Sequence, residues 1–569
     1  MEPKPKKARY RTDDLRADVV AGIAVTALMV PHGMAYAELA GLPAINGLYT
    51  SVAALIGYAI FGPSRYLLLG PDSSLAPLIA AAVALAVVGN DPAQAVAVGA
   101  MLALASGLIC IIAGFAKLGS IAELLSRPVQ LGYLNGLAIV MIVSQLAKLF
   151  GFSVPSGSPP ARFVDTIQGI LDGRTDLTAL LIGSLSLFGI LAFAKRPQIP
   201  MVFFAVVGAT LAVRLFDLSS LSVIGAVPKG IPTPAIPDLD AGDIGTIFAA
   251  SLGLAWVTLT DTTALSRGFA QRTGESVDPN REIIALGASN ISAGLFAGFP
   301  VSASTTRTTL AFASGGRTKV VGIVSAFLLV ILLFVGGGLI ADLPTTVLAA
   351  IVIAAAISLF DLAQLKWIRQ VRRSEFLLAM FTMVAVVVFG VLNGLLIAVG
   401  LSIANFVRRV WRPYDAVLGR IDQRPGHHDV RRHPEANQVP GLVVFRFDAQ
   451  LFFANSDYFL RRISQVIDES EAGGETVRRF IIAADPMTDV DTSGAEALWT
   501  LVRRLERRGI EFGFATMRGP VKDHLYAYGL YDRIGADRFY DSIGMATIAY
   551  VEDYNIDWTD WTERTDADR

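Results

Sequence analysis

Cysteine is nearly absent from this sequence: among 569 residues the only one is Cys110. A single thiol excludes an intramolecular disulfide framework and a metal site built on several cysteines. Charged residues are also scarce, at 17% of the chain, where an ordinary soluble domain carries about 25%. With a formal net charge of −1, the chain has no excess of basic residues for a nucleic-acid partner. The composition therefore argues against a soluble enzyme and against a nucleic-acid-binding protein.

The few charges are unevenly distributed. Residues 411–569 hold 47 of them, about 30% of that segment, whereas residues 1–410 are about 12% charged. In this first part the apolar residues form runs close to the ~20 residues that cross a ~30 Å hydrocarbon core. The sequence therefore predicts a polytopic α-helical membrane protein with a water-soluble tail. The expected boundaries are a basic N-terminus at 1–17, a transmembrane domain at 18–410, a linker at 411–439, a small α/β domain at 440–555 and a polar tail at 556–569.

Apolar windows between breaking residues predict about fourteen membrane spans. An even number returns the chain to the side where it began, so both termini share one side. Six basic residues precede the first span and Arg408, Arg409 and Arg412 follow the last, and such residues favour the cytoplasmic side. We therefore expect a multi-pass protein of the cytoplasmic membrane with both termini in the cytoplasm. The six residues are Lys4, Lys6, Lys7, Arg9, Arg11 and Arg16, and the spans lie near 19–37, 46–61, 71–88, 93–114, 121–150, 176–195, 199–216, 245–267, 281–298, 301–312, 318–340, 344–359, 375–391 and 393–410.

Two of these spans are too short or too irregular to cross the membrane comfortably as single helices. Both open with Pro-x-Ser, one at Pro71 to Ser73 and the other at Pro300 to Ser302. Their matching positions suggest an inverted repeat of seven plus seven spans, in which two half-helices begin near the membrane midplane. Free backbone N–H groups at a helix start, backed by the positive end of the helix dipole, suit an anion. The alternative is that these residues only cap ordinary helices.

Four ionisable residues interrupt the apolar spans: His32, Asp72, Asp261 and Arg307. Such groups are costly in a membrane and usually face a cavity or a partner. A carboxylate at Asp261 beside an anion site could take a proton or a cation and so control whether the anion binds. Alternatively, Asp261 and Arg307 form a structural ion pair. His32 either binds substrate or satisfies a backbone carbonyl freed by Pro31.

Several runs then resemble the SulP family of sulfate permeases and related anion transporters, and the resemblance covers nearly the whole chain. These runs are Val30-Pro31-His32-Gly33-Met34-Ala35-Tyr36-Ala37-Glu38-Leu39-Ala40-Gly41-Leu42-Pro43, Gly47-Leu48-Tyr49, Gly70-Pro71-Asp72-Ser73, Asp278-Pro279-Asn280-Arg281-Glu282, Ala285-Leu286-Gly287-Ala288-Ser289-Asn290, and Gly298-Phe299-Pro300-Val301-Ser302 on to Arg307.

The resemblance implies a fourteen-span fold with a core and a gate domain, an elevator-like movement of the core, and a homodimer. It also implies that the anion binds between the two half-helix starts, with Asp261 as the carboxylate of the coupling ion. Two positions depart from many members similar to sulfate permeases, which have Gln in place of His32 and Glu in place of Asp261. An Asp at the second place also occurs in sodium-linked bicarbonate members. The implied substrate-binding residues are His32, Tyr36, Asp72, Ser73, Ser74, Ser302, Ala303, Ser304, Thr305 and Arg307.

The tail alternates strand-like and helix-like runs, which indicates a small α/β domain. It resembles the STAS domain that ends SulP proteins, with Asp491 to Gly494 at the signature between a loop and a helix. Ser493 stands where related bacterial regulators are phosphorylated, so Asp491 and Ser493 are candidate regulatory residues; the alternative is that Ser493 caps the helix. A cytosolic protein is the partner this domain would take. His427, His428 and His433 are interpreted as residues of a solvated loop rather than as metal ligands.

Two hypotheses from different classes follow. The first is a secondary transporter of small inorganic anions, with sulfate as the expected substrate and H⁺ or Na⁺ as the co-transported ion. Bicarbonate linked to sodium, or a dicarboxylate linked to protons, is the alternative substrate. The second is a membrane sensor or scaffold without transport that acts through its tail. No nucleotide loop, zinc cluster or nucleophile arrangement supports an enzyme, and no bound cofactor is expected.

Overall fold

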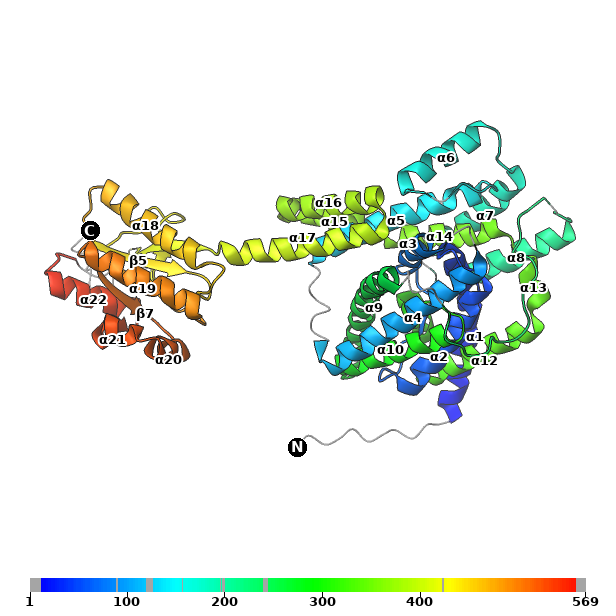
Figure 1. The fold of residues 1–569 in the computed structure, drawn as a ribbon, viewed down its shortest axis with the longest axis horizontal. Helices are drawn as coiled ribbons and strands as arrows, with labels where there is room; N and C mark the ends of the chain where they lie inside the picture. The colour runs from blue at the N-terminus through cyan, green and yellow to red at the C-terminus, as the bar shows by residue number, and fades with distance from the viewer. Residues whose placement is uncertain are drawn as a thin grey trace. The chain divides into compact units, whose positions relative to one another are not determined.

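The computed structural model describes residues 12–87, 91–118, 126–155, 157–194, 196, 200–218, 220–238, 244–421 and 424–558. The chain divides into two compact units, Met1–Ser402 and Ile403–Arg569. The first is helical apart from one pair of very short strands, and the second is a mixed α/β unit (Figure 1). This division matches the change in charge density along the sequence, because the apolar segment and the charged segment fold separately.

A helix of the structure lies on each of the fourteen expected spans. Among the described residues, six helical stretches are long and apolar enough to cross a membrane: α1, α4, α5, α9, α17 and the combined stretch Thr345–Val371. The helices on the expected spans are α1 (Thr12–Leu39), α2 (Ile45–Phe61), α3 (Ala76–Ala86), α4 (Pro92–Phe115), α5 (Arg127–Leu149), α7 (Leu177–Phe193), α8 (Met201–Leu215), α9 (Ile244–Thr273), α10 (Pro279–Leu295), α11 (Thr305–Ala313), α12 (Val320–Val335), α14 (Thr345–Leu359), α16 (Arg373–Phe389) and α17 (Val391–Trp411). Two further helices were not expected: α6 (Pro159–Leu171) and α15 (Leu362–Val371). The expected span 318–340 is divided at Gly336 into α12 and α13 (Gly337–Ala341).

The packing of these helices confirms the inverted repeat. Helix α4 packs against α9 and α10, and its counterpart α12 packs in the same way against α1 and α2. Likewise α5 packs against α16, and its counterpart α14 packs against α7. The short strands β1 (Leu69–Gly70) and β2 (Ser302–Ala303) pair antiparallel, as expected when one half is inverted relative to the other. We call α1 to α4 with α9 to α12 the first helix group, and α5, α7, α14 and α16 the second.

Small residues allow a close contact between two helices of the first group. A Cβ atom at Gly287 on α10 would lie 2.6 Å from the carbonyl oxygen of Gly107 on α4, and the reverse substitution would be equally close. Such backbone approach is typical of membrane helices, which associate through close packing because lipid tails supply no hydrophobic driving force. The contact fixes α4 against α10 and so places the chain segments that lead into the candidate site.

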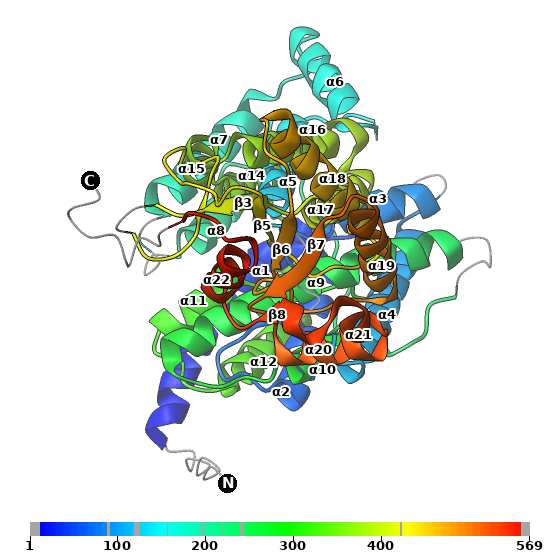
Figure 2. The same ribbon diagram turned by 90° about the vertical axis from the view of Figure 1, so that its left-hand side faces the viewer.

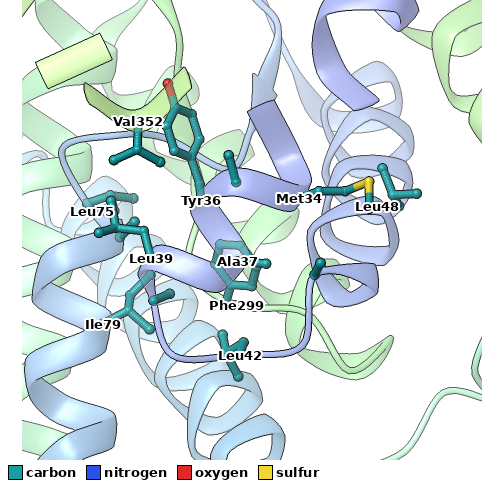
Figure 3. Close-up of a cluster of buried hydrophobic side chains, with 14 of the residues drawn as sticks. Met34, Tyr36, Ala37, Leu39, Leu42, Leu48, Leu75, Ile79, Phe299 and Val352 are labelled. Atoms are coloured by element: carbon teal, nitrogen blue, oxygen red, sulfur yellow. The ribbon is translucent and has the colours of Figure 1, made fainter. Parts of the chain in front are cut away.

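The interior of the first unit is a large cluster of buried apolar side chains. Tyr36 on α1 belongs to it, beside Leu75 at the start of α3 and Val352 on α14 (Figure 3). Tyr36 is 5% exposed, so only its hydroxyl brings polarity into this apolar surrounding. The cluster reaches residues from both helix groups, and the candidate site lies at its edge.

The second unit is a six-stranded sheet with helices on both faces. Its strand order is β4-β3-β5-β6-β7-β8; β5 to β8 run parallel, and β3 is antiparallel to both neighbours. Figure 2 shows α18 and α19 on one side of the sheet and α22 on the other. The elements are β3 (Asp415–Gly419), β4 (His428–Asp429), β5 (Leu442–Phe447), α18 (Ser456–Ala472), β6 (Arg479–Ala483), α19 (Thr492–Arg507), β7 (Glu511–Ala515), α20 (Gly519–Ala527), α21 (Leu530–Ile534), the 3₁₀ helix Ala536–Arg538, β8 (Phe539–Tyr540) and α22 (Ile543–Tyr554).

One expected boundary differs from the structure. The segment 411–439, expected to be a linker, contains β3 and β4, and β3 pairs with the central strand β5. The reason is burial: Ala416 and Leu418 pack with apolar residues of the sheet and of α22. The alternation of strands and helices expected from residue 441 to residue 515 is present as β5, α18, β6, α19 and β7. Of the outer segments, residues 1–11 and 559–569 lie outside the described residues.

Candidate functional site

The two predicted half-helix starts lie side by side. β1 leads into α3 and β2 leads into α11, and the pairs Leu69 with Ala303 and Gly70 with Ser302 join the two strands. The backbone N–H of Ser304 donates to the carbonyl oxygen of Leu68 at 3.3 Å and extends the ladder. Because β1 and β2 are buried, the segments that lead into the short helices α3 and α11 lie inside the unit rather than at its surface. The structure thus brings together two segments from opposite halves of the sequence.

Asp261 on α9 is tied to the first of these starts. The Ser74 hydroxyl lies 2.9 Å from Asp261 Oδ2 and 2.9 Å from Asp72 Oδ1, and the Ser74 backbone N–H donates to Asp72 Oδ1 at 3.0 Å. Ser74 is buried, whereas both carboxylates are half-buried. One serine therefore holds a carboxylate of α9 and a carboxylate of the segment between β1 and α3 at one place.

The residue after Asp261 holds the second start, and the sequence reasoning missed it. Thr262 Oγ1 accepts a hydrogen bond from the backbone N–H of Ala303 at 3.2 Å and lies 3.4 Å from the hydroxyl of Ser302. Thr262 and Ser302 are both buried. Neighbouring residues of α9 thus support both half-helix starts. The available signal was the run of threonines around Asp261, which is unusual in an apolar span.

Arg307 lies buried between the two starts at 2% exposure. Its Nη1 donates to the carbonyl oxygen of Pro71 at 2.5 Å and its Nη2 to that of Ser302 at 3.4 Å. The alternative of an Asp261 and Arg307 ion pair is not what the structure has, because Arg307 bonds to backbone carbonyls and Asp261 accepts from Ser74. The guanidinium therefore ties the two chain segments together and places a positive charge at their junction.

His32 and Tyr36 lie one turn apart on α1, with ring centroids 5.6 Å apart in an edge-to-face arrangement. His32 Nδ1 is 2.9 Å from the carbonyl oxygen of Leu28. A helical proline at position 31 frees the carbonyl of Ala27 instead, so the histidine does not compensate for Pro31. His32 Nε2 has no hydrogen-bond partner among the described residues. The Tyr36 hydroxyl interacts with the side chain of Ser73, which links α1 to the first half-helix start.

The remaining predicted residues differ in their placement. Ser304 precedes α11 and is buried, and its side chain makes no capping hydrogen bond to the helix. Thr305 is the first residue of α11 and is exposed. Ala303 offers only its backbone, which is engaged with Thr262. The first helix group thus supplies every residue that the sequence predicts for substrate binding or coupling. These residues lie on α1, before α3, on α9 and around the start of α11.

In the second unit, Asp491 caps α19. One of its carboxylate oxygens accepts from the backbone N–H of Gly494 at 2.7 Å and the other from that of Phe453 at 3.0 Å. The expected alternative, in which Ser493 is the cap, is therefore wrong, because the carboxylate two residues earlier has that position. Ser493 is half-buried in the first turn of α19.

The sequence was compared with models of known protein families. The sulfate permease family model matches residues 15–382, and the STAS domain model matches residues 433–546. The chain belongs to the sulfate permease family. A probable sulfate transporter of Mycobacterium tuberculosis (strain CDC 1551 / Oshkosh) is 40% identical over 546 residues, which cover 95% of this chain and 96% of that protein.

Solved structures agree on the fold of this sulfate permease family member. The murine Solute Carrier 26 family member A9 anion transporter in its inward-facing state matches with a TM-score of 0.87 and 22% identity, over 95% of this chain and 92% of that chain. The transmembrane domain of a cyanobacterium bicarbonate transporter matches with a TM-score of 0.60 and 23% identity, over 69% of this chain and 99% of that chain. The chain is a multi-pass membrane anion transporter of the sulfate permease family with a C-terminal STAS domain, and not an enzyme.

Proposed function

We propose that this protein is a secondary active transporter that carries sulfate across the cytoplasmic membrane together with H⁺ or Na⁺. The observation that carries the proposal is the junction of the two half-helix starts around the buried Arg307. Backbone N–H groups at helix starts together with a guanidinium favour an anion over a cation or a neutral solute. The probable sulfate transporter of Mycobacterium tuberculosis, with its similarity along 95% of this chain, favours sulfate as the anion.

The charges at the site give the reason for a coupling ion. Asp72, Asp261 and Arg307 sum to a net charge of −1 when both carboxylates are ionised. A divalent anion is then repelled, because a negative charge already stands beside its site. Neutralising one carboxylate with a proton or a sodium ion removes the excess and lets the anion bind. Asp261 is the carboxylate we assign to this role, because it lies on α9 and meets the half-helix start through Ser74.

The movement we propose is an elevator-type displacement of the first helix group against the second. Every predicted site residue belongs to the first group, so this group would carry the bound anion as one body. We further propose that the protein acts as a homodimer with both termini in the cytoplasm. The STAS domain would then meet a cytosolic protein, with Asp491 and Ser493 in the region that responds.

The test is uptake into proteoliposomes of the purified protein. Labelled sulfate, bicarbonate and a dicarboxylate are compared, each under an imposed proton or sodium gradient. Sulfate uptake that follows one gradient supports the proposal and identifies the coupling ion. Sodium-driven bicarbonate uptake, or proton-driven dicarboxylate uptake, would show that the substrate is that anion and not sulfate. No uptake of any of them favours the sensor or scaffold hypothesis.

The coupling role of Asp261 is tested with Asp261→Asn, which keeps the side chain's size but cannot ionise. We expect uptake to lose its dependence on the driving ion gradient, because the variant cannot take up and release the coupling ion. Asp342→Asn is the matched control, since Asp342 pairs with Arg214 in a half-exposed ion pair away from the half-helix starts. Unchanged gradient-driven uptake by a folded Asp261→Asn protein would remove the coupling assignment.

A further inference from the structure

Tyr133 on α5 is a buried polar residue that the family motifs leave aside. Its side chain is 4% exposed, and its hydroxyl oxygen has no hydrogen-bond partner among the described residues. A buried hydroxyl without a partner is unfavourable, and buried polar groups are nearly always hydrogen-bonded. The Tyr133 hydroxyl is therefore a candidate to bond with an acceptor that the described part of the protein does not provide.

The hydroxyl belongs to the surroundings of Asp261. Tyr133 lies in the same buried cluster as Tyr36 on α1, Leu75 before α3 and Val257, which precedes Asp261 by one turn of α9. The phenol of Tyr133 also interacts electrostatically with the carboxylate of Asp261. Helix α5 contacts α1, which carries Tyr36, and α3, which follows Ser74 in the chain. One side of α5 therefore faces the first half-helix start. Tyr133 thus approaches the site from the second helix group, whereas the residues predicted from the sequence to bind substrate or couple transport all come from the first.

The packing of α5 explains this orientation. A Cβ atom at Gly132 would lie 2.1 Å from the carbonyl oxygen of Ala379, and one at Gly136 would lie 2.9 Å from that of Met383, so these glycines press α5 against α16. Successive helix residues are turned by about 100°. Tyr133, next to Gly132, therefore points to a different side from the glycine face, and α16 fixes it there.

The hydroxyls of the site differ in how their hydrogens are used. Ser74 has one hydroxyl hydrogen and two carboxylate acceptors within 2.9 Å, Asp72 and Asp261, so none remains for a ligand. The Tyr36 hydroxyl interacts with the side chain of Ser73. The Tyr133 hydroxyl, in the same buried cluster, has no protein acceptor for its hydrogen among the described residues.

We propose that the hydroxyl of Tyr133 donates a hydrogen bond to the transported anion and thereby closes the site from the second helix group. This inference rests on the proposed function, because it assumes that the anion binds at the half-helix starts. A hydrogen bond between a neutral donor and an anion is stronger than one between neutral groups. The bound anion would supply the acceptor that the described residues do not.

The test is Tyr133→Phe, which removes the hydroxyl and keeps the ring. In proteoliposomes with labelled sulfate, we expect KM to rise about tenfold or more, with the maximal rate within about twofold and the gradient dependence unchanged. Tyr49→Phe is the matched control: Tyr49 lies in the apolar cluster, is 8% exposed and makes no hydrogen bond at the site, so its KM should stay that of the unaltered protein.

Two results would overturn the inference. An unchanged KM in Tyr133→Phe would mean that the ring only packs. A changed gradient dependence at constant anion KM would place the hydroxyl with the coupling ion instead. Failure of the proposed substrate is a separate result: if the unaltered protein carries bicarbonate and no sulfate, the same comparison is made with bicarbonate, and Tyr133→Phe must still weaken anion uptake.

Discussion

Replacing Arg307 tests whether the buried guanidinium holds the site together. Arg307→Lys keeps the positive charge, but an ammonium reaches one backbone carbonyl where the guanidinium reaches two. The carbonyl of Pro71, which accepts at 2.5 Å, would keep its donor, and that of Ser302, which accepts at 3.4 Å, would lose it. Arg307→Gln also removes the charge, and its shorter side chain leaves both carbonyls without their donors.

The magnitudes follow from those two bonds. A hydrogen bond from a charged group contributes about 1.5 to 3 kcal/mol, and a 3.4 Å bond belongs below that range, at about 1 kcal/mol. Arg307→Lys should therefore lower kcat/KM for the anion about fivefold. Arg307→Gln loses both bonds and the charge, about 3 kcal/mol or more, and should lower kcat/KM by at least a hundredfold.

The assay is initial-rate uptake in proteoliposomes over a range of anion concentrations, at protein amounts equalised by immunodetection. Arg65→Gln is the control, because Arg65 is 58% exposed in its ion pair with Glu275 and such pairs contribute ~0–1 kcal/mol. The decisive feature is the order: lysine intermediate, glutamine lowest. Wild-type kinetics in a folded Arg307→Gln protein would refute the view that this charge supports the anion site.

Two further predictions concern the STAS unit and are read by pulse proteolysis in urea, scored on its fragment. Asp415→Asn should destabilise the unit by about 2 to 3 kcal/mol, because Asp415 accepts from the buried Arg462 at 2.7 Å and the guanidinium would keep only the exposed Glu469, at 3.5 Å, as its counter-charge; a shift below 1 kcal/mol would contradict this. The hydrogen bond from Arg479 lowers the pKa of Asp553 below its ordinary 3.8, so the pair stabilises the fold above about pH 4 and this contribution is lost as pH falls through the lowered pKa. Asp553→Asn should therefore differ from the unaltered protein at pH 7 and converge with it near pH 2, whereas an equal difference at both values would be evidence against the linkage.

The membrane fold was predictable because its signals are local. The length of an apolar run reports a span, and the Pro-x-Ser motifs at Pro71 and Pro300 report where a helix begins inside the membrane. Helix α6, Pro159–Leu171, was missed because polar residues such as Arg162 and Asp165 alternate with the apolar ones along its sequence, so no apolar window covers it. Strand β3 was missed because it is five residues long and its partner β5 follows only after a long polar segment.

The candidate site was predictable in its residues but not in their bonds. The sequence identifies Asp261 and Arg307 as charges in an apolar span, and an ion pair between them is the simplest expectation. In the structure Arg307 instead donates to two backbone carbonyls. Every residue has a backbone carbonyl, so the residue types in the sequence do not identify these two acceptors. Tyr133 carries no signal of its own, because a single tyrosine in an apolar helix usually only packs, and its neighbour Asp261 is distant in the sequence.

The pairing of β1 with β2 also bears on how the protein is made. The two strands come from opposite halves of the chain, so the ribosome completes β1 long before β2 exists. Backbone polar groups without partners are very costly in hydrocarbon, and the partners of Leu69 and Gly70 are Ala303 and Ser302. The early half of the nascent chain therefore cannot settle at its final depth in the lipid by itself. We expect the segment around β1 to stay in the translocon or at the lipid surface until β2 has been synthesised. The final insertion of the two paired segments would then occur together.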